Sequence, residues 1–154
     1  MALLVFKHYV LKQINGKKRR ILEPLLPNLV FVYAREEVVK FCVEKIPYLR
    51  FYRNRMLALD PEERKHPPLT INYREMMNFI RLTSIDDEHI KMVDVQHCHF
   101  KSGDEVRIID GKFKGIVGRV ARVSGQQTVV VDLEDLCLIA TAYVPSAFIE
   151  KKLL

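Results

Sequence analysis

The sequence predicts an α+β protein, with an antiparallel sheet and helices over residues 1–83 and a small β-barrel over residues 98–154. The first part combines an Asn-Gly turn between apolar runs with two segments of helical periodicity. The second part consists of short apolar stretches separated by glycines at about ten-residue spacing, a pattern typical of small barrels. Residues 84–97 carry two adjacent aspartates and no periodic pattern, so we expect them to link two domains.

The N-terminal elements follow from the side-chain pattern. Residues 3–11 are rich in β-branched and aromatic side chains, and the following Asn15-Gly16 pair tolerates positive φ, so a β-hairpin is expected. Residues 28–33, apolar after Asn28, suit a strand that is buried on both faces at the centre of the sheet. Residues 36–45 have a helical composition with acids at the start, where the helix dipole favours them.

The clearest helix begins after Asn72. This residue can cap the helix, and Glu75, three residues later, completes a capping box. Apolar residues then recur at helical spacing up to Ile80, and we interpret them as core. A short strand at residues 48–53 and a polar loop at residues 60–68 are expected before this helix.

Four short strands are expected in the last third of the chain. Turns at Asp110-Gly111 and Ser124-Gly125 join the first three of them. The strands cover residues 105–109, 115–123, 128–133 and 138–143.

Positive charge is concentrated in the first half of the chain. Residues 1–83 carry 16 Lys and Arg against 8 Asp and Glu, whereas residues 100–154 carry 8 against 7. Clustered bases gain affinity for a polyanion by releasing counterions, so this half is expected to face nucleic acid or an acidic protein surface. A well-solvated surface explains the same surplus, and composition leaves both interpretations open.

Four consecutive bases stand at the end of the predicted hairpin, and we identify them as candidate nucleic-acid contacts. They are Lys17, Lys18, Arg19 and Arg20. An exposed hairpin end is also the place where unpaired charge costs least, so a solvated tip is the alternative.

Composition excludes several classes of protein. The chain is 49% apolar, but its apolar runs are far shorter than the roughly 20 residues that cross a bilayer. No basic region precedes the apolar residues 2–6, so no signal peptide is predicted. Cys42, Cys98 and Cys137 are an odd number at wide spacing, which does not suggest disulfides. We expect a cytoplasmic protein with no membrane contact.

Catalytic and metal chemistry find little support in the sequence. His97-Cys98-His99 contains zinc-type ligands, but adjacent residues of a strand point to opposite faces and no second ligand pair follows. No catalytic glycine-rich signature appears, and the Asp86-Asp87 pair lies in the predicted linker. We therefore expect no metal, no cofactor and no enzyme activity.

Residues 100–120 resemble a KOW motif, which implies an SH3-like KOW β-barrel. Gly103 and Gly111 suit turns with unusual φ, and Gly115 and Gly118 allow a barrel strand to bend where a Cβ would clash. Exposed side chains would then carry the function, with Lys112, Phe113, Lys114 and Arg119 as candidates. The residues that carry the resemblance are Gly103, Val106, Gly111, Phe113, Lys114, Gly115, Gly118 and Val120.

The preceding part resembles the N-terminal domain of NusG-like transcription elongation factors. Residues 25–32 are similar to the Pro-Gly-Tyr-Val-hydrophobic-Val strand of that family, with Asn28 and Leu29 in place of its Gly and Tyr. Residues 68–79 are similar to the segment that enters the last helix of that domain. The Pro-Asn-Leu variant is most similar to specialised paralogues that antiterminate polysaccharide operons in Bacteroides-type bacteria.

The family's first strand and long helix have no counterpart here, so we expect an incomplete N-terminal domain. A sheet that lacks a neighbour exposes an edge open to pairing. We expect an exposed apolar surface around Leu29, Phe31 and the helix at residues 76–80.

The resemblance implies a transcription elongation regulator that binds RNA polymerase and acts in antitermination or against pausing on specific operons. Leu26, Leu29 and Phe31 occupy the motif positions where the family contacts the polymerase, although alternate residues of a strand must also face the domain interior. In relatives the KOW domain binds Rho or a small-subunit ribosomal protein. The alternative is a ribosome- or RNA-binding KOW-domain protein whose basic first part binds RNA.

Overall fold

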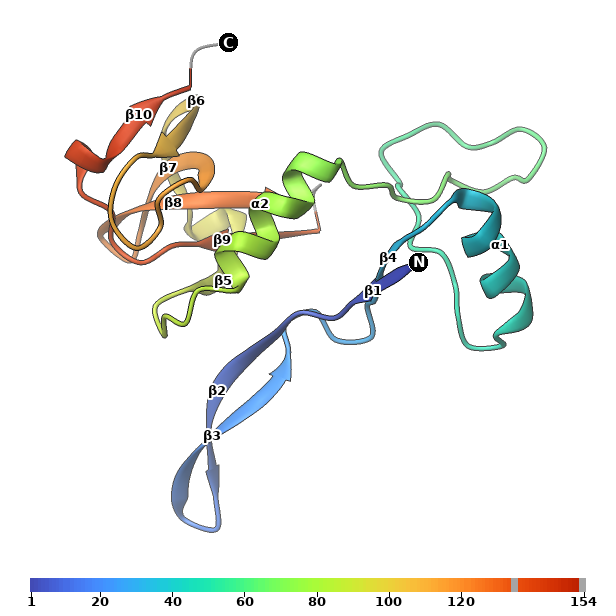
Figure 1. Cartoon of the computed structure of the whole chain (residues 1–154), viewed down its shortest axis with the longest axis horizontal. Coiled ribbons are helices and arrows are strands. Elements are labelled where there is room, and N and C mark those ends of the chain that lie inside the picture. Colours follow the sequence, from blue (N-terminus) through green and yellow to red (C-terminus); the bar gives the residue numbers. More distant parts are fainter. Residues whose placement is uncertain (134–135, 153–154) are drawn as a thin grey trace. The chain divides into compact units, whose positions relative to one another are not determined.

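The computed structural model describes residues 1–133 and 136–152, and it divides the chain into two compact units, Met1–Thr70 and Ile71–Leu154. The described residues contain two α-helices and antiparallel sheets, which confirms the α+β class (Figure 1). None of these helices is long and apolar enough to span a membrane. The division between the units falls between Thr70 and Ile71, so the helix that the sequence assigned to the first domain belongs to the second unit.

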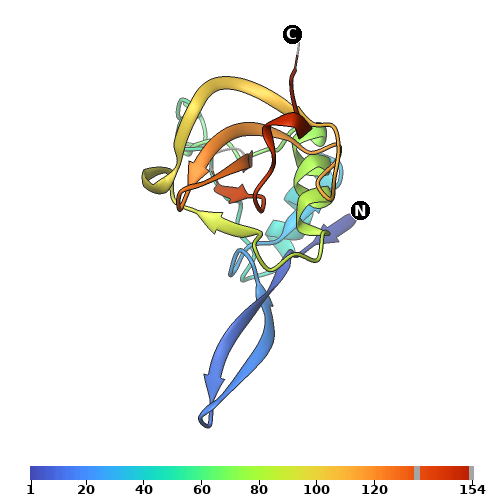
Figure 2. The same cartoon turned by 90° about the vertical axis from the view of Figure 1, so that its left-hand side faces the viewer.

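The longest element of the first unit is a two-stranded hairpin of β2 (Lys7–Ile14) and β3 (Lys17–Pro24). Asn15 and Gly16 form its turn with φ of 50° and 75°, the left-handed conformation that a type I′ turn requires. The predicted hairpin is thus confirmed. Figure 2 shows it as a strongly twisted ribbon, the usual form of two strands with no further neighbour.

The strand expected at the centre of the first sheet lies instead in a two-stranded sheet, so this prediction was wrong. Strand β4 covers only Phe31–Tyr33 and pairs with β1 (Ala2–Leu4). The physical reason lies just before it, where Asn28 turns the chain with a φ of 60° and delays the extended segment. The Phe31 ring packs edge-on against Phe6, with 5.3 Å between the ring centroids.

Helix α1 (Glu36–Lys45) begins and ends at the predicted residues. Its two N-terminal acids and its C-terminal lysine suit the helix dipole, and Glu36 pairs with Lys40 at 2.8 Å. The strand expected at residues 48–53 is reduced to one bridge between Arg53 and Pro68. The polar loop that follows is confirmed.

The first unit has almost no buried core. Among residues 1–70, all of which the structure describes, Leu25 is the one buried apolar residue, and 8% of its surface is still exposed. Helix α1 buries none of its residues, and Leu11, Phe41 and Tyr48 are each more than half exposed. Burial on this scale does not offset the conformational entropy of ordering so many residues, so the apolar surface of this unit is suited to a partner.

The second unit contains helix α2 (Tyr73–Thr83) and a six-stranded antiparallel sheet in the order β10-β6-β7-β8-β9-β5. The four predicted strands are present, and the two short edge strands were not predicted. The edges β10 and β5 are not paired with each other in this order, so the predicted closed barrel is not seen among the described residues. The strands are β5 (Lys91–Val93), β6 (His99–Ile108), β7 (Val117–Val123), β8 (Gln126–Leu133), β9 (Cys137–Ala140) and β10 (Ile149–Lys151), with 3-10 turns at Val95–His97 and Ser146–Phe148.

Strand β6 bends where its pairing with β7 is interrupted. Phe100 pairs with Ala121, and the next pair joins Glu105 to Arg119, so residues 101–104 of β6 stand opposite a single residue of β7. A bulge of this size turns the strand and lets one sheet curve round its own core.

Helix α2 covers part of the sheet and is tied to β7. Phe79 and Leu82 are fully buried, and the Asn78 side chain donates to Val117 O at 2.6 Å and accepts from Val117 N–H at 2.9 Å. The predicted cap is confirmed, because the Asn72 side chain accepts a hydrogen bond from Arg74 N–H at 2.9 Å. The expectation of an exposed apolar helix face was wrong in its centre, since Phe79 faces the core.

The sheet is buried on both faces in its middle. Four consecutive residues of β8, 128–131, are buried, and so are all residues of β9. Side chains alternate between faces along a strand, so burial of successive residues requires cover on each side. This unit therefore has the packed interior that the first unit lacks.

Replacing Gly118 tests the closest approach in this interior. A Cβ at Gly118 would lie 2.4 Å from Val130 O and 2.8 Å from Val129 Cγ1, so Gly118→Ala should destabilise the second unit by about 2–3 kcal/mol. Gly125 is the matched control, because a Cβ there meets nothing within 4 Å and Gly125→Ala should cost only about 1 kcal/mol for its positive φ. Urea unfolding of both variants measures the difference, and equal losses would contradict the clash.

The Asn78 link predicts a pH-dependent stability in a variant. In Asn78→Asp the carboxylate can still accept a hydrogen bond from Val117 N–H, but it has no proton to donate to Val117 O. The free energy of unfolding at pH 7 should therefore fall by about 1–3 kcal/mol. Only the protonated carboxyl can donate to that carbonyl, so its pKa in the folded state should be raised. The stabilising contribution is then present at low pH and lost as pH rises through the raised pKa.

Thermal unfolding at pH 4 and pH 7 checks this sign. The deficit of Asn78→Asp relative to the natural chain should shrink at the lower pH. Asn78→Leu removes both hydrogen bonds without adding a titrating group, so its deficit should change little between the two conditions. A constant deficit in the aspartate variant would contradict the bidentate contact.

Candidate functional site

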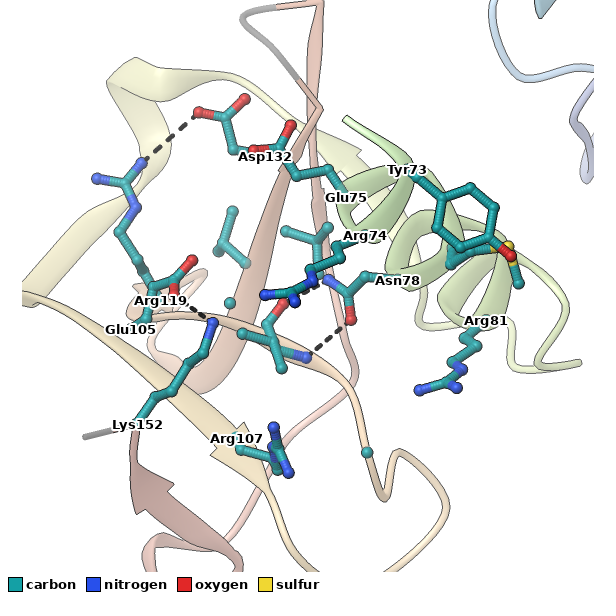
Figure 3. A pocket seen from close by; sticks show the side chains of 16 residues that line it. Tyr73, Arg74, Glu75, Asn78, Arg81, Glu105, Arg107, Arg119, Asp132 and Lys152 are labelled. Carbon is teal, nitrogen blue, oxygen red and sulfur yellow. Dashed lines mark hydrogen bonds and ion pairs between the residues drawn. The ribbon is translucent and has the colours of Figure 1, made fainter. Parts of the chain in front are cut away.

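A groove of about 790 Å³ lies between α2 and the sheet of the second unit (Figure 3). Residues of α2 form one wall, and residues of β6, β7 and β8 form the other, together with Gly115 before β7 and Lys152 just after β10. We call it the arginine groove, after Arg74, Arg81, Arg107 and Arg119. Its other lining residues are Tyr73, Glu75, Met77, Asn78, Glu105, Gly115, Val117, Gly118, Val130, Val131, Asp132 and Lys152.

The Asn78–Val117 link positions three of the arginines. Arg74 and Arg81 stand four residues before and three residues after Asn78, so they share its face of α2. Arg107 is the β6 register partner of Val117, the residue that Asn78 holds. Figure 3 shows these three side chains around the same stretch of the groove.

The far end of the groove is occupied by paired charges. Arg119 lies 4.1 Å above the Phe100 ring and 3.9 Å from Asp132, which register places on the same face of the sheet. Lys152 pairs with Glu105 at 3.0 Å. These acids are therefore engaged with neighbouring bases, in contrast to the three arginines near Asn78.

Arg74, Arg81 and Arg107 have no ion pair with any acid among residues 1–133 and 136–152. All three are exposed, and Arg81 Nη1 lies 3.9 Å from the position that a Cβ on Gly115 would take. Sequence analysis missed this site. The spacing of Arg74 and Arg81 on one predicted helix face was an available signal, but nothing in the sequence placed that face beside Arg107.

Most of the predicted KOW residues support the fold, either as buried side chains or as glycines in turns and close contacts. Val106 and Phe113 are buried, so Phe113 is a core residue and not an exposed functional side chain. Gly111 and Gly115 have φ of 80° and 90°, which only glycine adopts readily. Gly103 was expected in a turn but lies in the interrupted segment of strand β6, and half-buried Val120 stands opposite that segment on β7.

Two lysines of this stretch differ in their surroundings. Lys112 pairs with Asp87 at 3.1 Å, and Asp87 also accepts hydrogen bonds from the backbone N–H and the ring of His89. Partial burial opposes ionisation of Asp87, but these hydrogen bonds prevail and lower its pKa. Asp87 thus anchors the segment after α2 to the KOW turn, whereas Lys114 is exposed.

Three apolar residues predicted to contact polymerase lie in the first unit. Leu26, Leu29 and Phe31 are each half-buried, so part of every side chain is accessible. The Phe31 ring packs against the Phe6 ring. Their contact with RNA polymerase stays a prediction.

The four bases of the hairpin are all exposed, at the start of β3. Pairing in the ribbon places Lys18 and Arg20 on one face and Lys17 and Arg19 on the other. Arg20 lies 4.1 Å above the Tyr9 ring. The ribbon therefore presents positive charge on both of its faces.

The His97-Cys98-His99 stretch does not form one site. Cys98 is buried in an apolar cluster with Ala121, Val123 and Leu138, while both histidines are exposed. Among the residues that the structure describes, no group of three metal-ligating side chains is brought together. Burial raises the pKa of the Cys98 thiol, and burial raises that of Cys137 to about 11.

These pKa shifts predict the order of thiol reactivity. The thiolate is the reactive form, so Cys98 and Cys137 should resist alkylation by iodoacetamide at pH 8 in the folded protein. Cys42 is half-buried and should be modified first. Mass spectrometry of the native and urea-unfolded protein measures the sites, and rapid native labelling at Cys137 would contradict the described core.

The comparisons with known proteins identify one motif. Residues 102–132 match the family model of the KOW motif, a range that runs from within β6 through β7 to within β8 of the second unit. No curated protein and no solved structure matches the chain. The predicted KOW motif is thus confirmed, and it indicates a nucleic-acid- or protein-binding role of the kind found in NusG-type and ribosomal proteins.

Proposed function

We propose that this chain is a transcription elongation regulator that binds RNA polymerase and acts against pausing or termination on specific operons. It would do so as a cytoplasmic binding protein with no catalytic centre. The observation that carries the proposal is the contrast between a packed, KOW-bearing unit and a preceding unit with a single buried apolar residue. The resemblance of residues 25–32 to the NusG strand supports RNA polymerase as the proposed partner.

The mechanism follows from differential contact. A partner that binds the elongating conformation of the polymerase more tightly than the paused one shifts the population toward elongation. Apolar anchors such as Leu26, Leu29 and Phe31 are suited to this role, since desolvated aliphatic and aromatic side chains dominate most interfaces. The KOW-bearing unit would then bind Rho or a small-subunit ribosomal protein.

A second function is favoured by the charge of the first part. The exposed bases at positions 17–20 and the surplus of positive charge up to residue 83 suit RNA, as in a ribosome- or RNA-binding KOW protein. Binding of that kind weakens steeply with salt, whereas docking through apolar anchors does not. The salt dependence of the natural complex therefore separates the two proposals.

A substitution of Leu29 tests the polymerase contact. Leu29→Asp should reduce binding to purified bacterial RNA polymerase by at least about tenfold and abolish any shortening of pauses, because it places a charge in a desolvated contact. Binding is measured by biolayer interferometry and pausing by single-round transcription. The urea unfolding of the second unit should be unchanged.

The matched control is Leu59→Asp, in a loop residue that is 56% exposed and lies outside the NusG-like strand. It carries the same change of charge and should retain binding. If the natural chain fails to bind polymerase but binds ribosomal RNA with a steep salt dependence, the second function replaces the first.

A further inference from the structure

The arginine groove concentrates positive charge that the rest of its unit does not share. Residues 71–154 carry 11 Lys and Arg against 12 Asp and Glu, so this unit is close to neutral overall. Three arginines nevertheless surround one stretch of the groove without an ion pair to any acid of the described ranges. The groove lining as a whole carries five bases against three acids, and this local surplus of positive charge favours an anionic ligand.

The arginines belong to elements that are fixed relative to one another. The Asn78 side chain makes both of its hydrogen bonds to the backbone of Val117, at 2.6 and 2.9 Å. Arg74 and Arg81 lie before and after Asn78 along α2. Arg107 is the register partner of Val117 on β6. The guanidinium groups are thus carried by a packed helix and sheet and not by loops, which lowers the entropy that binding would cost.

We propose that the arginine groove binds a single strand of nucleic acid through its phosphodiester backbone. Arg74 and Arg81 are seven residues apart, about 10 Å along the helix axis, and Arg107 faces them from the sheet. A strand with a phosphate at every nucleotide can contact all three groups at once. Arginine matches phosphate with paired N–H donors, which suits it to this contact better than lysine.

Two further features favour a strand over other anions. Tyr73, at the start of α2, lines the same groove with 63% of its surface exposed, and exposed aromatic rings beside bases are typical of single-strand binding sites. Gly115 adds no side chain beneath Arg81, so a ligand backbone can approach there. Small inorganic anions would use neither the ring nor the length of the groove.

The proposal goes beyond the KOW match, because Arg74 and Arg81 precede the matched residues 102–132. It also does not depend on polymerase binding. A chain that fails to bind polymerase could still bind a strand in this groove, and the reverse holds as well.

Fluorescence anisotropy with a labelled ten-nucleotide oligo(U) RNA and the matching oligo(dT) tests the groove in the full chain. The hairpin bases 17–20 are first changed to Gln, so that binding there does not mask the result. Arg74→Gln, Arg81→Gln and Arg107→Gln together should then weaken binding at least about tenfold. The slope of log affinity against log salt should fall by about 2, the value for three phosphate contacts on a single strand.

The control variant carries the same change of charge elsewhere on the second unit: Lys91→Gln, Lys101→Gln and Arg122→Gln, all exposed residues outside the groove. It should bind nearly as the parent does. A separate Tyr73→Leu variant should weaken binding about tenfold while leaving the salt slope unchanged, because it removes stacking and not charge. Circular dichroism confirms that each variant is folded.

The outcomes separate the sources of the anion. Equal binding of RNA and DNA supports recognition of the shared phosphate backbone, and preference for RNA supports the proposal with RNA as the ligand. Equal losses in the groove and control variants would overturn it, because binding would then reflect net charge alone. Tighter binding of a ten-residue poly-Glu peptide, or equal competition by inorganic phosphate, would also overturn it.

Discussion

The Asn78 amide donates to the carbonyl of Val117 and accepts from its N–H, and the arrangement of the second unit depends on this pair of hydrogen bonds. The β7–β8 register begins at Arg119, so Val117 has no strand partner on that side. Ile108 N–H bonds to Ile116 O, so the alternation of an antiparallel ladder points the polar groups of Val117 away from β6. The amide therefore replaces a missing strand neighbour, and buried Phe79 and Leu82 complete the attachment of α2.

The two units differ in how much apolar surface they bury. The second buries consecutive residues of β8 and β9 and fills its interior with branched aliphatic side chains. The first leaves its hairpin, its short sheet and helix α1 with exposed apolar side chains on each. Its ordered backbone is supported by local hydrogen bonds and turns, and its stability in isolation should be low. A partner that covers this surface would contribute to folding and binding at the same time.

The elements that sequence predicts well here are those with local causes. The Asn15-Gly16 turn, the acids and lysine of α1 and the Asn72 cap all act within a few residues, and the structure has each of them where expected. Two of the KOW glycines were predicted for the same reason, since Gly111 has a positive φ and Gly118 leaves no room for a Cβ. The prediction of a central strand at residues 28–33 was wrong, because apolar composition does not show how many neighbouring strands the chain provides.

The helix at residues 73–83 shows a different limit. Its existence and cap were predicted, but its assignment to the first domain rested on order along the chain, while its packing depends on Phe79, Leu82 and Asn78 meeting the sheet. Only α2 brings Arg74 and Arg81 to Arg107, so the groove could not be predicted from the motif. A segment that began after α2 would contain the whole KOW match. It would lack Asn78, the hydrogen-bond partner of the Val117 N–H and C=O, and two arginines of the groove. The structural module of this unit is therefore the helix together with the motif.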